Sequence, residues 1–186
     1  MPIPLNDLQR VQQQCWHADD ELRWIVAAIS DTGCRMAEIV GLSKTDVRLD
    51  GDIPHISIRP RPWRRLKTVS SERYIPLVGS ALWGITRAYQ STNSEMLFPR
   101  YNDGVSTNSN SASAALSKWL KQQTNPDCTM HSFRHSFRDR LRAVECPIEL
   151  TDALGGWSTD GIGAAYGQGY SLQLKQKWLS AIVLKT

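Results

Sequence analysis

The sequence has no long apolar run, no closely spaced cysteine pairs and no internal repeat. Its longest apolar stretch, WIVAAI at residues 24–29, is far too short to span a bilayer, and the N-terminal MPIPLNDLQRV lacks the features of a secretory signal. Cys15, Cys34, Cys128 and Cys146 do not have the spacing of a disulfide-rich scaffold. These absences favour a cytoplasmic protein with free thiols and no membrane partner.

Length and composition are typical of one soluble globular domain. The 186 residues are 41% hydrophobic and 22% charged, which is enough apolar material to bury a core. Seven tryptophans also argue against disorder. We expect a single domain over residues 1–186, with its core at about 19–170 and a C-terminal helix at 171–186 that packs either in cis or on a neighbouring protomer.

Positive charge is concentrated in two segments. The net charge is +4 and the isoelectric point is near 9.0, values that suit a nucleic-acid partner but are shared by many other proteins. Residues 59–73, RPRPWRRLKTVSSER, hold six basic side chains and one acid, and residues 134–142 add four arginines. The two basic segments are therefore candidates for one binding surface.

Hydrophobic periodicity predicts a mainly α fold with a small antiparallel β-sheet, an α+β class. The β-prone runs lie within 47–60, around an Asp-Gly turn, and at 72–77, with the basic loop between the second and third strands. Residues 100–113 have no periodicity and are predicted to form a polar loop. Helical patterns cover residues 5–16, 19–33, 35–42, 79–90, 111–123, 130–143, 148–154 and 171–184.

The segment MHSFRHSFRDRLRA, residues 130–143, combines histidine and arginine in an unusual density. On a helix, His131, Arg134, His135 and Arg138 would share one face, because they are spaced by three and four. Such a face repels itself unless an anion lies against it. The candidates are carboxylates elsewhere in the chain, a metal-bound acid, or a phosphate.

A zinc site is a weaker interpretation of the same segment. Cys128, His131 and His135 have the spacing C-x-x-H-x-x-x-H, and histidines four apart do face one way on a helix. The neighbouring arginines disfavour a dication, and the chain offers neither a fourth ligand nor a general-base glutamate in the pattern H-E-x-x-H.

A lone arginine follows the glycine that ends an apolar helix. Arg35 would begin the next helix, with Glu38 one turn on and able to hold its guanidinium in a bidentate pair. Taken alone, this pattern favours a structural ion pair on the surface.

The order of five short motifs changes that interpretation. The chain contains TGxRxxEIxxLxxxDV at residues 32–47, then Lys67 followed by RYIPL at 73–77, then His131-x-x-Arg134, then LGGW ending at Trp157, and Tyr166 nine residues later. In this order the motifs resemble the tyrosine recombinase family, also called the phage integrase family. The resemblance extends over nearly the whole chain.

The resemblance implies a set of catalytic residues, and their chemistry suits phosphoryl transfer. Arg35 and Arg134 would clamp the scissile phosphate, because arginine binds phosphate oxygens bidentately and stays charged. His131 would contact the same phosphate or assist proton transfer, and Lys67 would protonate the leaving 5′ oxygen. Tyr166 would be the nucleophile that forms a 3′-phosphotyrosine. Glu38 and His135 would support these groups, and neither a cofactor nor a metal is implied.

The tryptophan at 157 and the choice between two tyrosines are the points at which the match to the family pattern is less direct. Trp157 stands where histidine is commoner; an indole donates one hydrogen bond to a phosphate oxygen but cannot shuttle protons. Tyr170 competes with Tyr166, and only the spacing from Trp157 selects Tyr166, so that Tyr170 is expected to pack in the core.

The resemblance also implies partners. Double-stranded DNA at recombination sites would be the substrate, contacted along its backbone by Arg59, Arg61, Arg64 and Arg65. Family members assemble as tetramers on DNA and act with accessory DNA-bending proteins, and they carry an N-terminal DNA-binding domain that this chain is expected to lack. The expected function is a site-specific recombinase of a phage or other mobile element. A type IB topoisomerase-like nicking-closing enzyme and a non-catalytic DNA-binding regulator are the alternatives.

Overall fold

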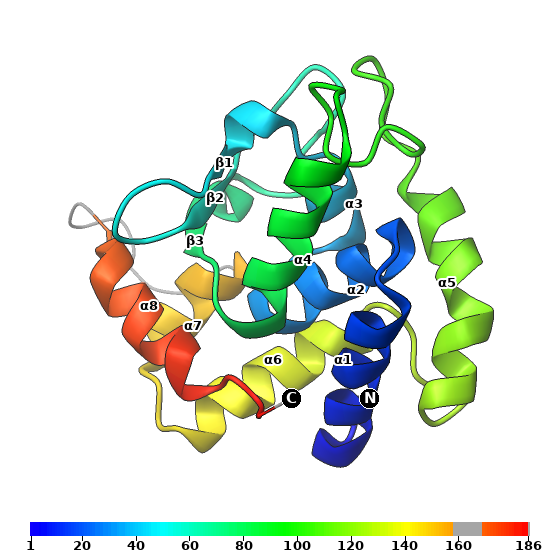
Figure 1. Ribbon diagram of the computed structural model, residues 1–186. Helices are drawn as coiled ribbons and strands as arrows, with labels where there is room; N and C mark the ends of the chain where they lie inside the picture. Colours follow the sequence, from blue (N-terminus) through cyan, green and yellow to red (C-terminus); the bar gives the residue numbers. More distant parts are fainter. Residues whose placement is uncertain (158–168, 186) are drawn as a thin grey trace.

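The computed structural model describes residues 1–157 and 169–185, and it shows a mainly α-helical fold with one small sheet (Figure 1). The predicted α+β class is therefore confirmed. The helices are α1 (Leu5–Ala18), α2 (Glu21–Thr32), α3 (Met36–Val40), α4 (Gly79–Ser91), α5 (Ser109–Gln123), α6 (Ser132–Ala143), α7 (Ile148–Gly155) and α8 (Leu172–Ala181), with 3₁₀ turns η1 (Lys44–Asp46) and η2 (Val69–Ser71).

The sheet has three antiparallel strands in the order β1-β2-β3. They are β1 (Val47–Arg48), β2 (His55–Ile58) and β3 (Arg73–Pro76), and the register pairs Ile56 with Ile75. All three strands fall within the predicted β-prone runs. The basic segment lies in the connection between β2 and β3, as the sequence predicts.

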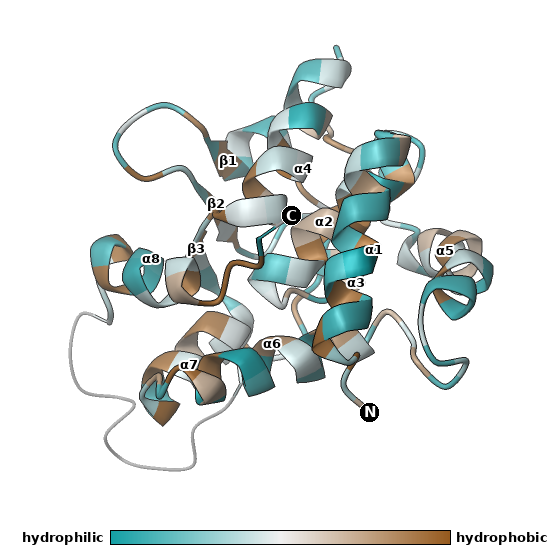
Figure 2. Cartoon of the chain, turned by 60° about the horizontal axis from the view of Figure 1, so that its bottom comes forward, coloured by the Kyte–Doolittle hydropathy of each residue, from teal (hydrophilic) through white to brown (hydrophobic). Residues whose placement is uncertain are grey.

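Helix α2 is the central element of the core. The side chain of Asp20 accepts a hydrogen bond from the Arg23 amide at 3.0 Å and caps its N-terminus, and Gly33 ends it in the left-handed conformation (φ 62°). Every residue from Ile25 to Thr32 is buried. Figure 2 shows α2 largely in hydrophobic colours near the centre, whereas α1 is largely hydrophilic in colour. Helices α1 and α4 pack on α2.

The core extends further than the predicted range of 19–170. Leu8 and Val11 of α1 and Leu179 of α8 are fully buried, because both terminal helices turn an apolar stripe inward. Helix α8 packs in cis on β3, where the Lys175 ammonium donates a hydrogen bond to the Tyr74 carbonyl at 2.9 Å (Figure 1).

The predicted polar loop at 100–113 is shorter than expected. Helix α5 begins at Ser109, because the side chain of Asn108 accepts a hydrogen bond from the Ser111 amide at 3.1 Å and caps the helix there. The irregular part therefore ends at residue 108. The sequence alone suggested a loop because serine and asparagine are poor helix formers in a helix interior.

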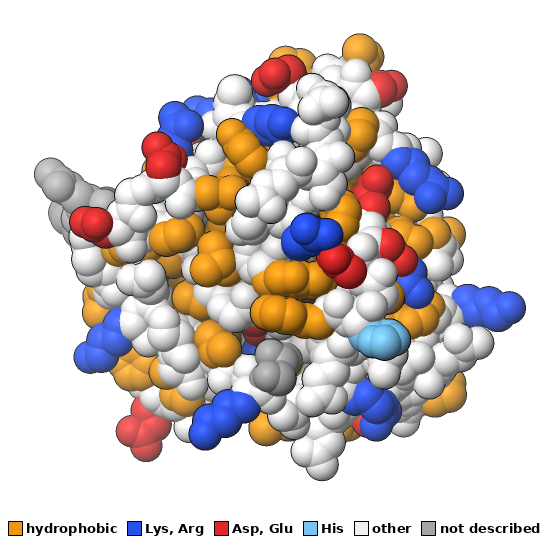
Figure 3. Space-filling model, in the orientation of Figure 1, with side chains coloured by type: hydrophobic (Ala, Val, Ile, Leu, Met, Phe, Trp, Pro, Cys, Tyr) orange, Lys and Arg blue, Asp and Glu red, His pale blue; other side chains and the backbone are white. Residues whose placement is uncertain are grey.

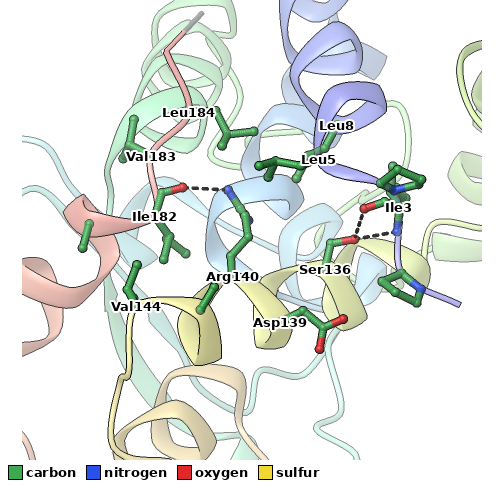
Figure 4. A pocket seen from close by; sticks show the side chains of 14 residues that line it. Ile3, Leu5, Leu8, Ser136, Asp139, Arg140, Val144, Ile182, Val183 and Leu184 are labelled. Carbon is green, nitrogen blue, oxygen red and sulfur yellow. Dashed lines mark hydrogen bonds between the residues drawn. The ribbon is translucent and has the colours of Figure 1, made fainter.

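An apolar cavity of about 450 Å³ lies where both ends of the chain meet α6 (Figure 4). The Ile3 amide donates to Ser136 Oγ at 2.7 Å, and Arg140 Nη1 donates to the Ile182 carbonyl at 3.0 Å. These contacts fix both chain ends to one face of α6. All four cysteines are buried free thiols, and no helix in the described ranges is long and apolar enough to cross a membrane.

Candidate functional site

The arginines of α6 differ in their partners. Arg138 pairs with Asp152 at 3.1 Å and Arg140 pairs with Asp31 at 2.9 Å. Arg134 instead donates to two backbone carbonyls, those of Gly33 and Gly155. Within residues 1–157 and 169–185 no carboxylate lies at ion-pair distance from Arg134. Arg142 also pairs with a carboxylate, that of Asp139 at 3.0 Å. Arg134 is therefore the arginine of α6 whose charge no carboxylate of the described residues pairs with.

Arg134 is a buried cation, with only 3% of its surface exposed. Burial and the neighbouring charge of Arg35 lower the pKa of its guanidinium to about 10, which still leaves it charged at neutral pH. Its Nε has no hydrogen-bond partner in the described part of the chain, although the same holds for Nε of Arg138 and Arg140. A buried positive charge without a carboxylate is unfavourable alone and becomes favourable when an anion binds.

Arg35 lies immediately before α3 and is held by Glu38. Arg35 Nη1 donates to Glu38 Oε1 at 2.7 Å, and the Arg35 amide donates to Glu38 Oε2 at 2.8 Å. The predicted pair is thus present, but the bidentate geometry is wrong, since one guanidinium nitrogen and the backbone share the carboxylate. Arg35 Nη1 also donates to Ser71 Oγ at 3.0 Å.

Arg73 also belongs to this network, although the sequence did not predict it as a site residue. It is buried in β3, and its Nη2 lies 3.0 Å from Glu38 Oε2. Its Nε also donates to the Leu154 carbonyl at the end of α7. Alternation along β3 was the available signal, because Arg73 and Ile75 occupy the same buried face of the strand.

His131, the residue before α6, is close to several cations. Its pKa lies below the ordinary value because of partial burial and because of the nearby charges of Arg134, His135, Arg35 and Lys67. Hydrogen bonds join the three segments that carry these cations: Arg134 at the start of α6 donates to the Gly33 carbonyl, two residues before Arg35, and Arg35 donates to Ser71 in the loop after β2. The His135 ring lies edge-on to His131, with centroids 5.1 Å apart, and both histidines are exposed.

Trp157 lies against the same arginines. The Arg134 and Arg138 guanidinium carbons lie 4.8 and 5.0 Å from the centroid of its ring. The Trp157 amide donates to the Asp152 carbonyl, and the ring lies directly over Gly155, where a β-carbon would collide with it. The absence of a side chain at Gly155 therefore allows the indole to reach the arginine cluster.

The four arginines predicted to contact DNA are not equivalent. Arg59, Arg61 and Arg64 all form ion pairs with Asp46, whose side chain is completely buried. Arg64 is itself only 2% exposed and donates to the Gly41 carbonyl, so its expected place on the surface is wrong. Arg65 is exposed. On the face in view in Figure 3, basic side chains are scattered among acids rather than gathered.

The two candidate tyrosines, Lys67 and the possible zinc ligands are the remaining predicted site residues. Tyr166 lies outside the described residues. Tyr170 is 40% exposed, so the expectation that it packs in the core is wrong. Lys67 is exposed. In the part of the chain that the structure describes, no cluster of His, Cys, Asp or Glu is arranged to hold a metal, and Cys128 is buried whereas His131 and His135 face solvent.

The fold and the cluster define a mainly α-helical protein with a partly buried cationic site. The chain belongs to the phage integrase family, whose model matches residues 5–170. A search of the curated proteins found no match.

Two solved structures of the Tn1549 transposon integrase share the fold. One, in complex with circular intermediate DNA, has a TM-score of 0.59 and 12% identity over 89% of this chain and 63% of that chain. The other, a tyrosine-to-phenylalanine variant in complex with transposon right end DNA, has a TM-score of 0.60 and 14% identity over 95% of this chain and 64% of that chain. The chain thus spans less than two thirds of either.

Proposed function

We propose that this chain is the catalytic part of a site-specific DNA recombinase that cleaves and rejoins DNA through a 3′-phosphotyrosine. The observation that carries the proposal is Arg134, a buried cation whose partners are two carbonyls and no described carboxylate, with Arg35 and His131 beside it. Membership of the phage integrase family and the likeness to integrases solved with DNA support it.

The proposed roles follow from these surroundings. Arg134 and Arg35 bind the non-bridging oxygens of the scissile phosphate, where negative charge grows as the nucleophile attacks. Arg35 is oriented by Glu38, and the charge of Glu38 is offset by Arg73, so the three side chains together retain one positive charge. The site therefore attracts an anion even though it contains a carboxylate.

Proton transfer is assigned to His131 and Lys67. The Tyr166 hydroxyl attacks phosphorus, the P–O5′ bond breaks, and the energy of that bond is conserved in the phosphotyrosine. The lowered pKa keeps His131 neutral at pH 7, so it is able to accept the tyrosine proton. Lys67 donates a proton to the leaving 5′ oxygen. Trp157 donates its indole N–H to a phosphate oxygen. In the reverse reaction the 5′-hydroxyl attacks and tyrosine leaves.

The experiment that tests the proposal is capture of the covalent adduct. The protein is incubated with nicked suicide duplexes that carry candidate attachment sequences, and the protein–DNA adduct is measured for wild type, Tyr166→Phe and Tyr170→Phe. We expect an adduct that is absent only in Tyr166→Phe. Loss only in Tyr170→Phe would overturn the assignment of the nucleophile. DNA binding without any adduct would favour a non-catalytic regulator.

Assembly and reaction type need a second measurement. We propose that the protein exchanges strands between two sites within a tetramer assembled on DNA, with accessory DNA-bending proteins as further partners. Recombinant products from two site-bearing duplexes, and a complex of four protomers, are the expected results. Relaxation of supercoiled plasmid without exchange would favour the nicking-closing alternative.

A further inference from the structure

The loop that carries Lys67 is fixed at both of its ends. On the N-terminal side, Arg61 and Arg64 exchange two backbone hydrogen bonds of 3.0 Å, and both side chains pair with the buried Asp46. On the C-terminal side, η2 leads to Ser71, which is 0% exposed. Lys67 itself is exposed between these two points. Its position is therefore set by the residues that hold the loop.

Ser71 connects this loop to the phosphate-binding arginine. Its Oγ accepts a hydrogen bond from Arg35 Nη1 at 3.0 Å and lies 3.0 Å from Thr68 Oγ1, next to Lys67 in the chain. A guanidinium only donates, so Ser71 Oγ is the acceptor toward Arg35, and its own proton and second lone pair both remain available for Thr68. Thr68 Oγ1 is in turn 2.9 Å from Ser70 Oγ. The result is a continuous chain of hydrogen bonds from Arg35 to the residue beside Lys67.

Two further contacts fix Ser71 from its backbone. The Ser71 carbonyl accepts a hydrogen bond from Arg73 Nη1 at 2.6 Å, and the Ser71 amide donates to the Thr68 carbonyl at 3.1 Å. Arg73 is the buried partner of Glu38, which also holds Arg35. The hydroxyl and the backbone of Ser71 thus attach the loop to the buried ion-pair network of Arg35, Glu38 and Arg73.

We propose that Ser71 is a positioning residue that sets the distance between the phosphate clamp at Arg35 and the proton donor at Lys67. The inference rests on the function proposed above for those two side chains. Clamp and donor must act on oxygens of one phosphorus, so an error of about 1 Å in their separation is costly to the rate. Ser71 itself does not touch the substrate.

Three single variants separate the two arms of this link. Ser71→Ala removes the hydroxyl that contacts both Arg35 and Thr68. Thr68→Val leaves the hydrogen bond between Arg35 and Ser71 intact and removes the contacts of the Thr68 hydroxyl with Ser71 and Ser70. Ser70→Ala is the matched control, because its hydroxyl is exposed and contacts Thr68 without reaching Arg35.

Each variant is assayed with two suicide substrates, one with the natural bridging 5′ oxygen and one with sulfur in its place. A leaving thiolate needs no proton, so a defect that acts through Lys67 disappears on the sulfur substrate. On oxygen we expect the adduct-forming rate constant to fall about tenfold in Ser71→Ala, the rate equivalent of one charge-assisted hydrogen bond. On sulfur, Thr68→Val should match wild type, and Ser71→Ala should keep the part of its defect that acts through Arg35. Wild-type rates for Ser71→Ala, or an equal loss of Thr68→Val on both substrates, would refute the inference.

A second readout does not depend on activity. Trypsin cleavage of the folded protein after Lys67 reports opening of the loop. The cleavage rate should rise several-fold in Ser71→Ala and Thr68→Val but not in Ser70→Ala, and an unchanged rate in both would refute the anchoring role. If wild type forms no adduct, the proposed function fails, while this rate still decides whether Ser71 holds the loop. If Ser71→Ala does not fold, Thr68→Val carries both measurements.

Discussion

Glu38 and Arg73 form a buried ion pair in which Glu38 Oε2 lies 3.0 Å from Arg73 Nη2, with side chains 4% and 3% exposed. The other oxygen of the same carboxylate accepts from Arg35. Glu38 therefore serves two arginines of different character, one buried and one that reaches the surface. Because one carboxylate pairs with two guanidinium groups, the three side chains together keep a net charge of +1.

Replacing Arg73 by methionine should destabilise the protein by about 3–5 kcal/mol, because it leaves Glu38 buried with too little compensating charge. Urea unfolding measures the loss. Arg87→Met is the control: it breaks the exposed pair with Asp19 and should leave the midpoint nearly unchanged. Adding Glu38→Gln to Arg73→Met should recover part of the stability, and equal stability of the single and double variants would contradict this account.

The ion pair also predicts a dependence of stability on pH. Burial alone raises the pKa of Glu38, but Arg73 and then Arg35 outweigh it, so the pKa lies below the ordinary value of 4.5. The unfolded state therefore binds more protons than the folded state as the carboxyl titrates. The stabilisation is fully present above pH 4.5 and is lost as pH falls through the lower folded pKa. The difference in unfolding free energy between wild type and Glu38→Gln should accordingly shrink between pH 6 and pH 3.

His131 should titrate below its ordinary pKa of 6.5 in the free protein. Partial burial and the charges of Arg134, His135, Arg35 and Lys67 all disfavour the imidazolium. A proton NMR titration of the His131 ring measures this pKa, with assignment by His131→Gln. Arg35→Ala and Lys67→Met should each raise the pKa toward 6.5, and saturating inorganic phosphate should also raise it. A pKa that neither variant changes would show that the cations do not converge on His131.

Neighbouring arginines in the basic loop should behave differently in DNA binding. Arg65 is exposed, so Arg65→Met should preserve stability and reduce the slope of log affinity against log salt by about 0.9 for one lost phosphate contact. Arg64 is buried against Asp46 and backbone carbonyls, so Arg64→Met should cost about 3 kcal/mol of stability. Fluorescence anisotropy with duplex DNA and urea unfolding measure the two effects. The reverse pattern would restore Arg64 as a DNA contact.

The sequence predicted most elements of the fold because their signals are local. The Asp20 cap, the glycine at 33 and the apolar stripe between them define α2 without reference to any other segment. The predicted start of α5 was wrong because Asn108, which caps the helix, lies in a run of serine and asparagine residues, any of which could be the cap. The inclusion of α1 in the core depends on contacts with α2, which periodicity alone does not specify.

The sequence could not show which arginines of the site are buried, because their carboxylate partners are distant in the chain. Arg35 with Glu38 is a local pair at helical spacing, so the sequence showed it. The partners of Arg64 and Arg73 are 18 and 35 residues away in the chain, at Asp46 and Glu38, and nothing in a basic loop reveals which arginine turns inward. The positioning role proposed for Ser71 depends on its contact with Arg35, 36 residues away in the chain, and no sequence motif marks it.

Gly155→Ala tests whether the close approach of Trp157 matters to the arginine cluster. Gly155 lies at the C-terminal end of α7 without positive φ, so the substitution introduces no backbone strain and its effect comes from the collision of the new methyl group with the indole. The ring should leave its place over Arg134 and Arg138. The indole N–H signal of Trp157 in a ¹H–¹⁵N spectrum, assigned with Trp157→Phe, should then shift, and adduct formation should fall about as far as in Trp157→Phe. Gly51→Ala is the control, because nothing lies within 4 Å of a β-carbon there, although its φ of 96° adds some strain of its own. If Gly155→Ala leaves both the indole signal and the cleavage rate as in wild type, the position of the Trp157 ring does not depend on the absence of a side chain at residue 155.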